Sequence, residues 1–287
     1  MAQLIMVEGL PGSGKSTTAH FLGEWLAGRG HAVAAFPEGR ADHPVDFEQV
    51  AVLSTEAFIG LVGDFPEQGE DLMRGAQKSG DSWLVRYGQR RAWPCELRAR
   101  LAEHDAYDGA VSPELHRRLL RESWDAFGDK AAHGEEVYLF ECVLIQNPLC
   151  ALMARFDEPL HVIEGHIRAL AESVSTLNPA LVYLDPGEPT AALERVAAER
   201  PAEWLESVIG YHCGQGYGLA RGFTGFEGYV DFMRRRREVE LDLLPRLGVP
   251  TLHVEVGDGD WDTHRSRITA FLEAHIDAPE AGLPLGA

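Results

Sequence analysis

The sequence lacks the features that mark secreted, membrane-embedded and disulfide-stabilised proteins. It has four cysteines among 287 residues, and none of them forms a CxxC pair or has the spacing of a zinc cage. The most apolar stretch, Val137 to Met153, is broken by polar residues and a proline, so it is not a membrane span. Residues 1–8 show neither the basic start nor the cleavage site of a signal peptide. We therefore expect a soluble protein in a reducing, cytoplasmic location, with no membrane partner.

Basic residues are also scarce. The chain has 26 Lys and Arg residues against 45 Asp and Glu residues, which gives a formal net charge of −19 at pH 7. Such a surface repels a phosphate backbone, so we expect no nucleic-acid partner. A nucleotide is not excluded, because backbone N–H groups, one lysine and a metal ion suffice to hold its phosphates.

Apolar runs alternate with helical patterns along the chain. Apolar residues recur at helical spacing in Ile163 to Val174 and in Trp204 to Ile209. Alternation of strand and helix is typical of a parallel sheet with helices on both faces, which binds ligands at the carboxyl ends of its strands. The runs that predict strands are Gln3–Val7, Ala32–Phe36, Val137–Phe140, Leu181–Leu184 and Thr251–Val256.

A complete phosphate-binding motif follows the first predicted strand and opens a helix. Residues 9–16, GLPGSGKS, match GxxxxGK[ST] in full. Glycines let the backbone curl around phosphates, Lys15 would neutralise charge on the transferred group, and the Ser16 hydroxyl would help to hold Mg²⁺. The hydroxyl of Thr17 either caps the helix or reaches a phosphate. We expect ATP or GTP to be bound by Gly9, Pro11, Gly12, Ser13, Gly14, Lys15, Ser16 and Thr17.

Acidic residues stand where two further strands end. Glu141 ends the third predicted strand, where it would hold the water shell of the metal or merely cap a turn. Glu38 and Asp42 follow the second strand, where an acid can take the proton of an attacking hydroxyl. Glu38 is the first candidate for this base and Asp42 the second, and the alternative is a solvated acidic loop. Arg40 and His43 would bind an anionic acceptor or face water.

The segment between the second and third strands, residues 45–134, is too long for a crossover, which needs about a dozen residues. It carries helical patterns, such as Leu115 to Phe127, and we expect a helical insertion within a single domain of residues 1–277. The insertion would form the acceptor site or be a scaffold only. Its aromatic and basic side chains would line that site or fill a local core; they are Trp83, Tyr87, Arg90, Arg91 and Trp93. Residues 278–287 are expected to be a flexible tail.

The chain resembles the nucleoside and nucleotide kinase group of P-loop proteins, of which thymidylate kinase is a member. The resemblance rests on residues 4–16 and on the segment LVYLDPGE, residues 181–188, with the arginines that follow it. It implies the P-loop NTPase fold, with a five-stranded parallel sheet and a lid at about residues 190–222. By this likeness Arg195 and Arg200 would stabilise charge on the transferred phosphoryl group.

The sequence departs from the pattern of that group at two places. Arg200 is followed by Pro201 where the lid usually reads Arg-Gly-Arg, and Phe140-Glu141-Cys142 replaces the usual Asp-Arg pair. The likeness therefore supports the fold and the phosphoryl donor better than the acceptor. Small-molecule kinases of the chloramphenicol phosphotransferase type also have an acid after the second strand, so a nucleoside-like metabolite or an antibiotic is a candidate acceptor.

Three weaker features have two interpretations each. Trp261 would stack on the nucleotide base or simply pack, and residues 214–218, GQGYG, would form a mobile loop or a plain connector. Arg234 to Arg237 would form a second anion clamp, but a solvated helix face is the commoner case. The preferred function is transfer of a γ-phosphoryl group to a small-molecule hydroxyl. The alternatives are a nucleotide-dependent switch acting on a protein partner and a purely regulatory binding module, and a homodimer is left open.

Overall fold

The computed structural model describes residues 3–276, which form two compact units. One unit comprises the chain up to Glu38 together with everything from Gly128 onward, and the other comprises Gly39–Phe127. The first is called the P-loop unit below, and the second is called the insertion unit.

A five-stranded parallel sheet forms the centre of the P-loop unit, with strand order β2-β6-β1-β7-β8. Each predicted strand is present, and this part of the sequence-based fold is confirmed. β1 lies in the middle of the sheet, so the loop that follows it is flanked on both sides by strand ends. The strands are β1 (Gln3–Gly9), β2 (Val33–Phe36), β6 (Val137–Glu141), β7 (Ala180–Asp185) and β8 (Thr251–Glu255).

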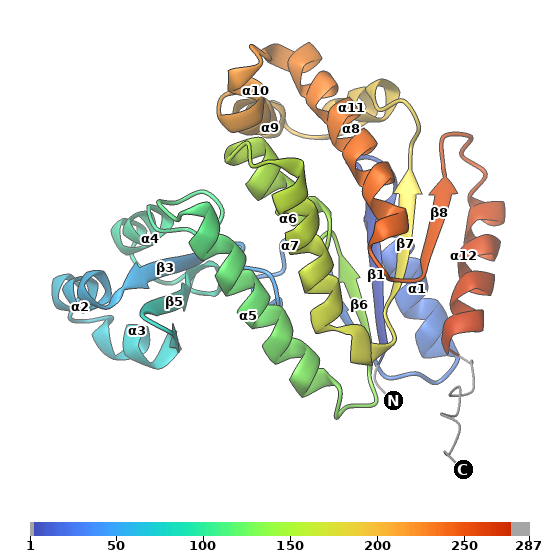
Figure 1. The fold of residues 1–287 in the computed structure, drawn as a ribbon. Helices are drawn as coiled ribbons and strands as arrows, with labels where there is room; N and C mark the ends of the chain where they lie inside the picture. Colours follow the sequence, from blue (N-terminus) through green and yellow to red (C-terminus); the bar gives the residue numbers. More distant parts are fainter. Residues whose placement is uncertain (1–2, 277–287) are drawn as a thin grey trace. The chain divides into compact units, whose positions relative to one another are not determined.

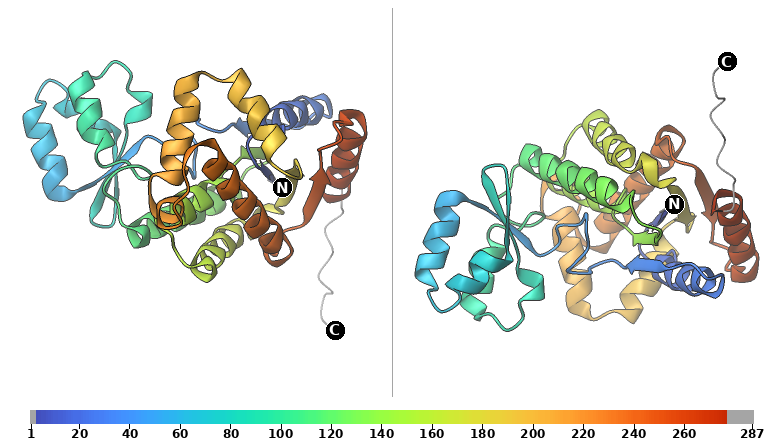
Figure 2. Two further views of the ribbon diagram at one scale, coloured as in Figure 1. Left: turned by 90° about the horizontal axis from the view of Figure 1, so that it is seen from above. Right: turned by 90° about the horizontal axis from the view of Figure 1, so that it is seen from below.

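Helices cover both faces of this sheet (Figures 1 and 2). Side chains alternate between the faces of a strand, and Ile5 and Val7 of β1 join one core with helices α1 (Lys15–Gly28) and α12 (Trp261–Ile276). Glu8 of β1 therefore points to the opposite face. Helices α7 (Leu160–Ser173) and α11 (Gly225–Leu243) lie on that face.

The remaining helices gather where the parallel strands end, at the top of Figure 1. A rare π-helix, η2, follows the short helix α6, and the expected lid at residues 190–222 is helical. Gly214, Gly216 and Gly218 pack tightly within it: a Cβ on Gly216 would lie 2.2 Å from the Arg155 carbonyl oxygen. The interpretation of residues 214–218 as a connector fits this packing. These elements are α6 (Gln146–Pro148), η2 (Leu149–Arg155), η3 (Ser175–Leu177), α8 (Thr190–Glu199), α9 (Ala202–Cys213), α10 (Gly216–Ala220) and η4 (Leu244–Arg246).

The insertion unit is not purely helical, which corrects the sequence-based expectation. Three antiparallel strands form a second sheet of order β3-β5-β4, and a turn at Gly80, whose φ is 55°, joins β4 to β5. The strands are short and a glycine turn sets their register, so helical periodicity gave no sign of them. The elements are β3 (Val50–Ser54), α2 (Thr55–Asp64), α3 (Gly69–Gly75), β4 (Ala76–Ser79), β5 (Ser82–Arg86), η1 (Tyr87–Gln89), α4 (Cys95–Ala102) and α5 (Pro113–Ala131), which continues into the P-loop unit.

A core within the insertion unit contains Trp93, Leu97 and Leu101, and Trp83 and Tyr87 pack against it. Tyr87 also donates a hydrogen bond of 2.8 Å to Asp105. The interpretation of these aromatic side chains as local core therefore fits the structure.

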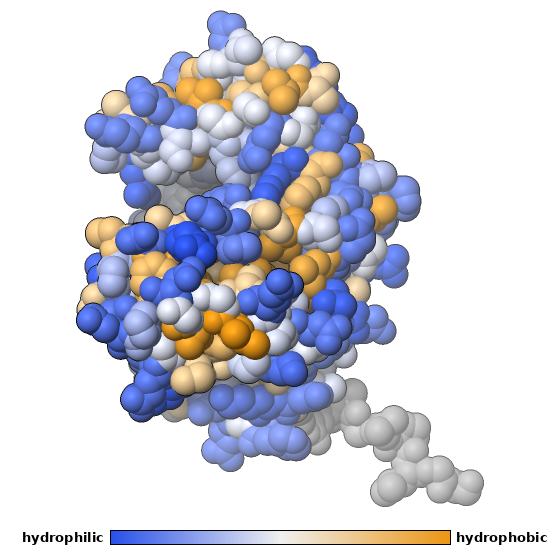
Figure 3. All heavy atoms as spheres, turned by 90° about the vertical axis from the view of Figure 1, so that its left-hand side faces the viewer, coloured by the Kyte–Doolittle hydropathy of each residue, from blue (hydrophilic) through white to orange (hydrophobic). Residues whose placement is uncertain are grey.

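The surface is mixed in character. The face shown in Figure 3 is mainly hydrophilic, with several apolar patches among the polar side chains. No helix within residues 3–276 is long and apolar enough to cross a membrane. The tail expected at residues 278–287 lies outside the described residues.

Candidate active site

The phosphate-binding loop connects β1 to α1 at the centre of the sheet. Gly9, Gly12 and Gly14 have φ angles of 142°, 78° and 89°, a region that side chains disfavour. A Cβ on Gly9 would lie 2.2 Å from the carbonyl oxygen of Leu184, so the loop also needs glycine for close packing on β7. The Ser13 hydroxyl is buried and has no hydrogen-bond partner among the described residues. The loop is therefore a cradle whose shape and orphaned hydroxyl fit a bound phosphate.

Lys15 is held across this loop. Its side chain is 6% exposed, and its Nζ atom donates a hydrogen bond of 3.0 Å to the carbonyl oxygen of Leu10. This contact satisfies only part of an ammonium group that has three donors. The remaining donors are available to phosphate oxygens in the cradle.

Ser16 and Glu141 meet beside the loop. The Ser16 hydroxyl donates a hydrogen bond of 2.5 Å to Oε1 of Glu141, which is 1% exposed and ends β6. A hydroxyl and a carboxylate are the hard oxygen ligands that Mg²⁺ prefers. Glu38, Glu141 and Cys142 also approach one another within 4.8 Å. Burial keeps the pKa of the Cys142 thiol well above its usual value, so Ser16 and Glu141 fit Mg²⁺ better than this sulfur does.

Glu38 is fixed by two neighbours at the end of β6. The amide Nε2 of Gln146 donates to its Oε1 over 2.5 Å, and the Cys142 thiol donates to its Oε2 over 3.4 Å. Cys142 has a φ angle of 69°, which is unfavourable for any residue except glycine. Strain at the end of a central strand is typical of functional sites. The sequence-based first candidate for the base is thus oriented, although its side chain is exposed.

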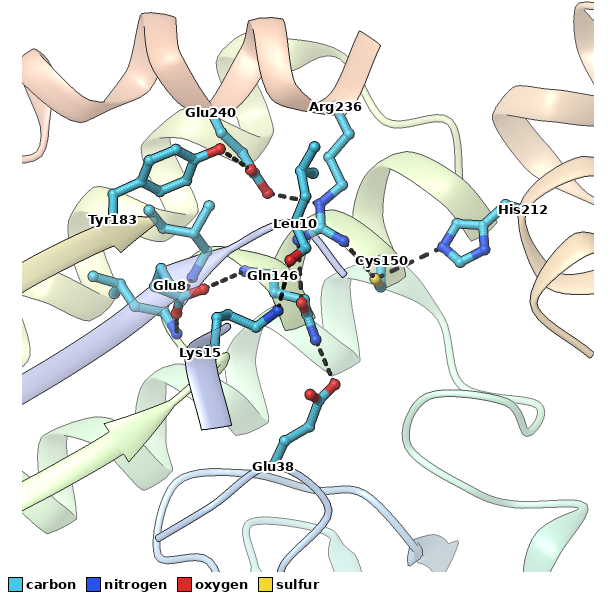
Figure 4. A network of polar contacts seen from close by, with 12 residues as sticks. Glu8, Leu10, Lys15, Glu38, Gln146, Cys150, Tyr183, His212, Arg236 and Glu240 are labelled. Atoms are coloured by element: carbon cyan, nitrogen blue, oxygen red, sulfur yellow. Dashed lines mark hydrogen bonds and ion pairs between the residues drawn. The ribbon is translucent and has the colours of Figure 1, made fainter. Parts of the chain in front are cut away.

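A buried chain of polar contacts leads from Glu38 to α11 (Figure 4). Nη2 of Arg236 donates to Oε1 of Gln146 over 3.4 Å, and Nε of Arg236 is 2.6 Å from Oε1 of Glu240. The Tyr183 hydroxyl donates to the other oxygen of Glu240 over 2.5 Å. Because Arg236 has only donors, it fixes which end of the Gln146 amide faces Glu38.

Glu8 supports the same region from β1. Its carboxylate accepts hydrogen bonds of 2.8, 3.0 and 3.1 Å from the backbone N–H groups of Leu144, Ile145 and Gln146. Burial raises the pKa of Glu8 to about 7, and these hydrogen bonds oppose the shift. Glu8 thus anchors the loop that carries Gln146.

A single cavity of about 700 Å³ joins these groups, a volume in the range of small-molecule sites. It is formed within the P-loop unit and opens from the phosphate cradle toward α9 and α11. Its lining includes Pro11, Gly12, Gly14, Lys15, Ser16, Thr17, Glu38, Glu141, Gln146, Cys150, Arg200, Trp204, Val208, His212, Tyr229, Met233 and Arg236.

The other sequence-predicted residues have different places. Arg200 lines the cavity, whereas Arg195 is exposed on α8. Trp261 packs on the loop, because a Cβ on Gly14 would lie 2.4 Å from its Cη2 atom. Asp42 belongs to the insertion unit, where its carboxylate is paired with Arg40.

The interpretation of Arg234 to Arg237 as a solvated face is wrong for half of the run. Arg236 is 1% exposed, and Arg237 forms hydrogen bonds of 2.6 and 2.7 Å with the buried carboxylate of Asp185. Arg234 and Arg235 are the partly exposed members that bond to nearby acids. Four consecutive arginines necessarily point to different sides of a helix, so the pattern alone did not reveal which one is buried.

Sequence analysis also missed Gln146, Cys150, His212 and Glu240. These residues are scattered over α6, η2, α9 and α11, and no local motif connects them. The one available signal was the polar pair Gln146–Asn147 inside an otherwise apolar stretch. A buried polar side chain in such a stretch needs hydrogen-bond partners, which Glu38 and Arg236 provide.

Comparison with known proteins gives no family assignment. No protein-family model and no curated protein matches the chain. Among solved structures, the chain is similar to thymidylate kinase from Candida albicans, at 12% identity and a TM-score of 0.45, over 96% of this chain and 93% of that one. So loose a similarity assigns no activity, and the P-loop α/β fold is established here by the sheet order and the loop themselves.

Proposed function

We propose that this protein is a kinase that transfers the γ-phosphoryl group of ATP or GTP to a hydroxyl group of a small molecule. The observation that carries the proposal is that one cavity contains the phosphate cradle, the Ser16–Glu141 pair and the oriented carboxylate of Glu38. A donor site, a metal site and a base are the parts that phosphoryl transfer to an alcohol requires.

The position of Glu38 favours a hydroxyl over a phosphate as the acceptor. An alcohol holds its proton at neutral pH and gains from a base in the transition state. A phosphate monoester is already ionised, and its charge of about −1.5 to −2 would be repelled by Glu38 and Glu141. A carboxylate oxygen of Glu38 lies within 4.8 Å of one of Glu141, and this pair of negative charges therefore suits an uncharged attacking group.

The donor would be bound by the loop and by its immediate neighbours. In this proposal the N–H groups of residues 9–16 and Nζ of Lys15 hold the phosphates, and Ser16 and Glu141 hold Mg²⁺. The ion would supply charge neutralisation on the phosphate oxygens when bound. Arg200 would stabilise the transferred group from the cavity wall, and Trp261 would support the loop rather than stack on the base.

Glu38 would take the proton of the acceptor hydroxyl on Oε2. Oε1 is occupied by the Gln146 amide at 2.5 Å, whereas Oε2 has only the weak thiol donor of Cys142 at 3.4 Å. The acceptor oxygen would then attack the γ-phosphorus while the bond to the nucleoside diphosphate breaks. Asp42 would have no part in this step, since Arg40 already neutralises its charge.

The test is a measurement of nucleotide consumption in the presence of Mg²⁺, with and without a panel of sugars, nucleosides and hydroxylated antibiotics. We expect consumption that depends on one class of acceptor and that Lys15→Met reduces by about 10²-fold or more. Lys130→Met is the matched control, because this lysine is exposed on α5 and should leave the rate unchanged. Nucleotide turnover that no acceptor increases would instead favour a nucleotide-dependent switch.

A further inference from the structure

The cavity has a second end, away from the phosphate-binding loop, to which the proposed nucleotide site assigns no ligand. This end is walled by η2, α9 and α11, all of which belong to the P-loop unit. A π-helix is rare in proteins and is frequently found at functional sites. The residues of these elements that line the cavity are Cys150, Trp204, Val208, His212, Tyr229, Met233 and Arg236.

Apart from Arg236, the titratable groups of this wall are uncharged near neutral pH. Burial lowers the pKa of His212 to about 4, and burial raises the pKa values of Cys150 and Tyr229. Nδ1 of His212 lies 2.7 Å from the carbonyl oxygen of Val208, which can only accept, so Nδ1 carries the proton. Nε2 of His212 is therefore an acceptor, and the Cys150 thiol lies 4.0 Å from it as a weak donor.

Arg236 is the one charged group that reaches this end from α11. Its charge is balanced by Glu240, whose Oε1 is 2.6 Å from Nε. Among the described residues, its two Nη groups contact Gln146 Oε1 at 3.4 Å and Cys150 Sγ at 3.8 Å. The contact to Gln146 exceeds the 2.7–3.2 Å of good N–H···O hydrogen bonds, and the Cys150 sulfur is a weak acceptor, so a ligand oxygen can improve on both contacts. The Arg236 side chain is 1% exposed and lines the cavity, so its guanidinium can bind a polar group of a ligand in a fixed position.

We propose that the cavity end between η2, α9 and α11 is the acceptor site, and that its ligand is an uncharged, ring-bearing alcohol with a carbonyl-type oxygen directed at Arg236. This inference rests on the proposed kinase function and specifies its substrate class. The ring lies between Tyr229, Met233 and His212, and the hydroxyl faces Glu38. All residues that line this acceptor site belong to the P-loop unit.

The charges decide against an ionic ligand. An anion beside Arg236 would meet a guanidinium that Glu240 already neutralises, and it would lie in the same cavity as Glu38 and Glu141. An ammonium group at this end would lie beside the guanidinium of Arg236, which repels it. In either case a charge would leave water for a wall of mostly neutral side chains, which is unfavourable unless the charge is paired. A neutral ring avoids this cost and buries its apolar faces.

The experiment uses a matched set of probes on the full-length protein loaded with Mg²⁺ and a non-hydrolysable ATP analogue. The set consists of hydroxymethylbenzamide, hydroxymethylbenzoate, hydroxymethylbenzylammonium and the cyclohexane counterpart of the first. Crystal soaks locate each probe, and calorimetry measures its affinity. We expect the neutral benzamide to occupy the site with its carbonyl on Arg236, and the two ions to bind at least about tenfold more weakly.

Two variants separate this site from the nucleotide site. Met233→Trp fills the cavity end from α11 and should abolish benzamide binding while the affinity for the ATP analogue is kept. Arg235→Met, on the exposed side of the same helix, should change neither. The inference is overturned if a charged probe binds here as tightly, if the cyclohexane probe binds equally well, or if no probe occupies this end. Failure of the ATP analogue to bind would instead overturn the kinase function itself.

Discussion

At the scale of single residues, the orientation of Glu38 depends on Gln146. Gln146→Leu keeps the volume of the side chain but removes the donor that lies 2.5 Å from Glu38 and the acceptor for Arg236. We expect kcat to fall by about tenfold or more, because the base is no longer held in place, while the KM for the nucleotide stays the same. Steady-state kinetics at saturating acceptor would measure both constants.

A double-mutant cycle shows whether Gln146 acts through Glu38. In a Glu38→Gln background, where kcat should already be lower by about 10²–10⁴-fold, Gln146→Leu should cost little more. Effects that multiply in the double variant would mean that Gln146 has an independent structural role. Unfolding curves of all four proteins provide the control, since a loss of kcat without a loss of stability excludes misfolding.

Glu8 makes stability depend on pH. The folded protein keeps the Glu8 proton up to a pKa of about 7, whereas the unfolded chain releases it near the ordinary value of 4.5. The contribution of this group is complete below pH 4.5 and is lost as pH rises through about 7, on the order of 3 kcal/mol in total.

Denaturant unfolding of wild type and Glu8→Gln at pH 5 and pH 8 measures this contribution. The variant cannot ionise, so the difference in unfolding free energy between the two proteins should shift in favour of the variant as pH rises. The subtraction removes the titrations of buried histidines, which are shared by both proteins. A difference that is the same at both pH values would show that Glu8 is ionised in the folded protein throughout.

Most residues of the proposed nucleotide site could be predicted from the sequence, but few residues of the proposed acceptor site could be. Lys15, Ser16, Glu38 and Glu141 follow strand ends, and parallel strands bring their carboxyl ends to one edge of the sheet. Arg236 has no such positional signal, because which side of a helix is buried depends on tertiary packing.

At the scale of elements, the β1–α1 loop depends on glycine. Gly14 has a φ angle of 89°, and an added Cβ would lie 2.4 Å from the Trp261 ring. We expect Gly14→Ala to destabilise the fold by about 1–3 kcal/mol and to weaken nucleotide binding, since the loop must move away from the phosphates.

Gly165 is the matched control for this substitution. It lies in the helix α7, and nothing lies within 4 Å of an added Cβ. Gly165→Ala should therefore stabilise the protein by about 0.5–1 kcal/mol and leave nucleotide affinity unchanged. Thermal unfolding with and without Mg²⁺-ATP would test both variants, and equal effects of the two substitutions would contradict the role given to the loop.

Long periodic elements were predictable, and short or irregular ones were not. The helix at Leu115–Phe127 and all strands of the parallel sheet appear where apolar periodicity placed them. The sheet of the insertion unit and the π-helix η2 were not predicted. Their backbone is determined by a turn and by packing against neighbouring elements, neither of which has a repeating sequence pattern.

At the scale of the whole molecule, ligand binding should stabilise the P-loop unit. A ligand at 100 times its Kd adds about 2.7 kcal/mol to the stability of the state that binds it. We therefore expect Mg²⁺-ATP to slow hydrogen exchange in β1 and α1, with a smaller effect when EDTA removes the metal. Lys15→Met should remove most of this protection, and protection that is unchanged in this variant would place the nucleotide elsewhere.

The two units have separate cores, and the structure of one was easier to predict from the sequence than the structure of the other. The P-loop unit contains the motif and the five-stranded parallel sheet that was predicted from the sequence. The insertion unit has its own sheet and its own apolar cluster, for which no comparable signature exists in the chain.

The most direct test of the nucleotide site, on which the proposed transfer depends, is calorimetric titration of the wild-type protein with a non-hydrolysable ATP or GTP analogue, with and without Mg²⁺. The site described here predicts binding at one site per chain that is stronger with Mg²⁺ and is lost in Lys15→Met. Absence of binding of either triphosphate to folded wild-type protein would contradict it.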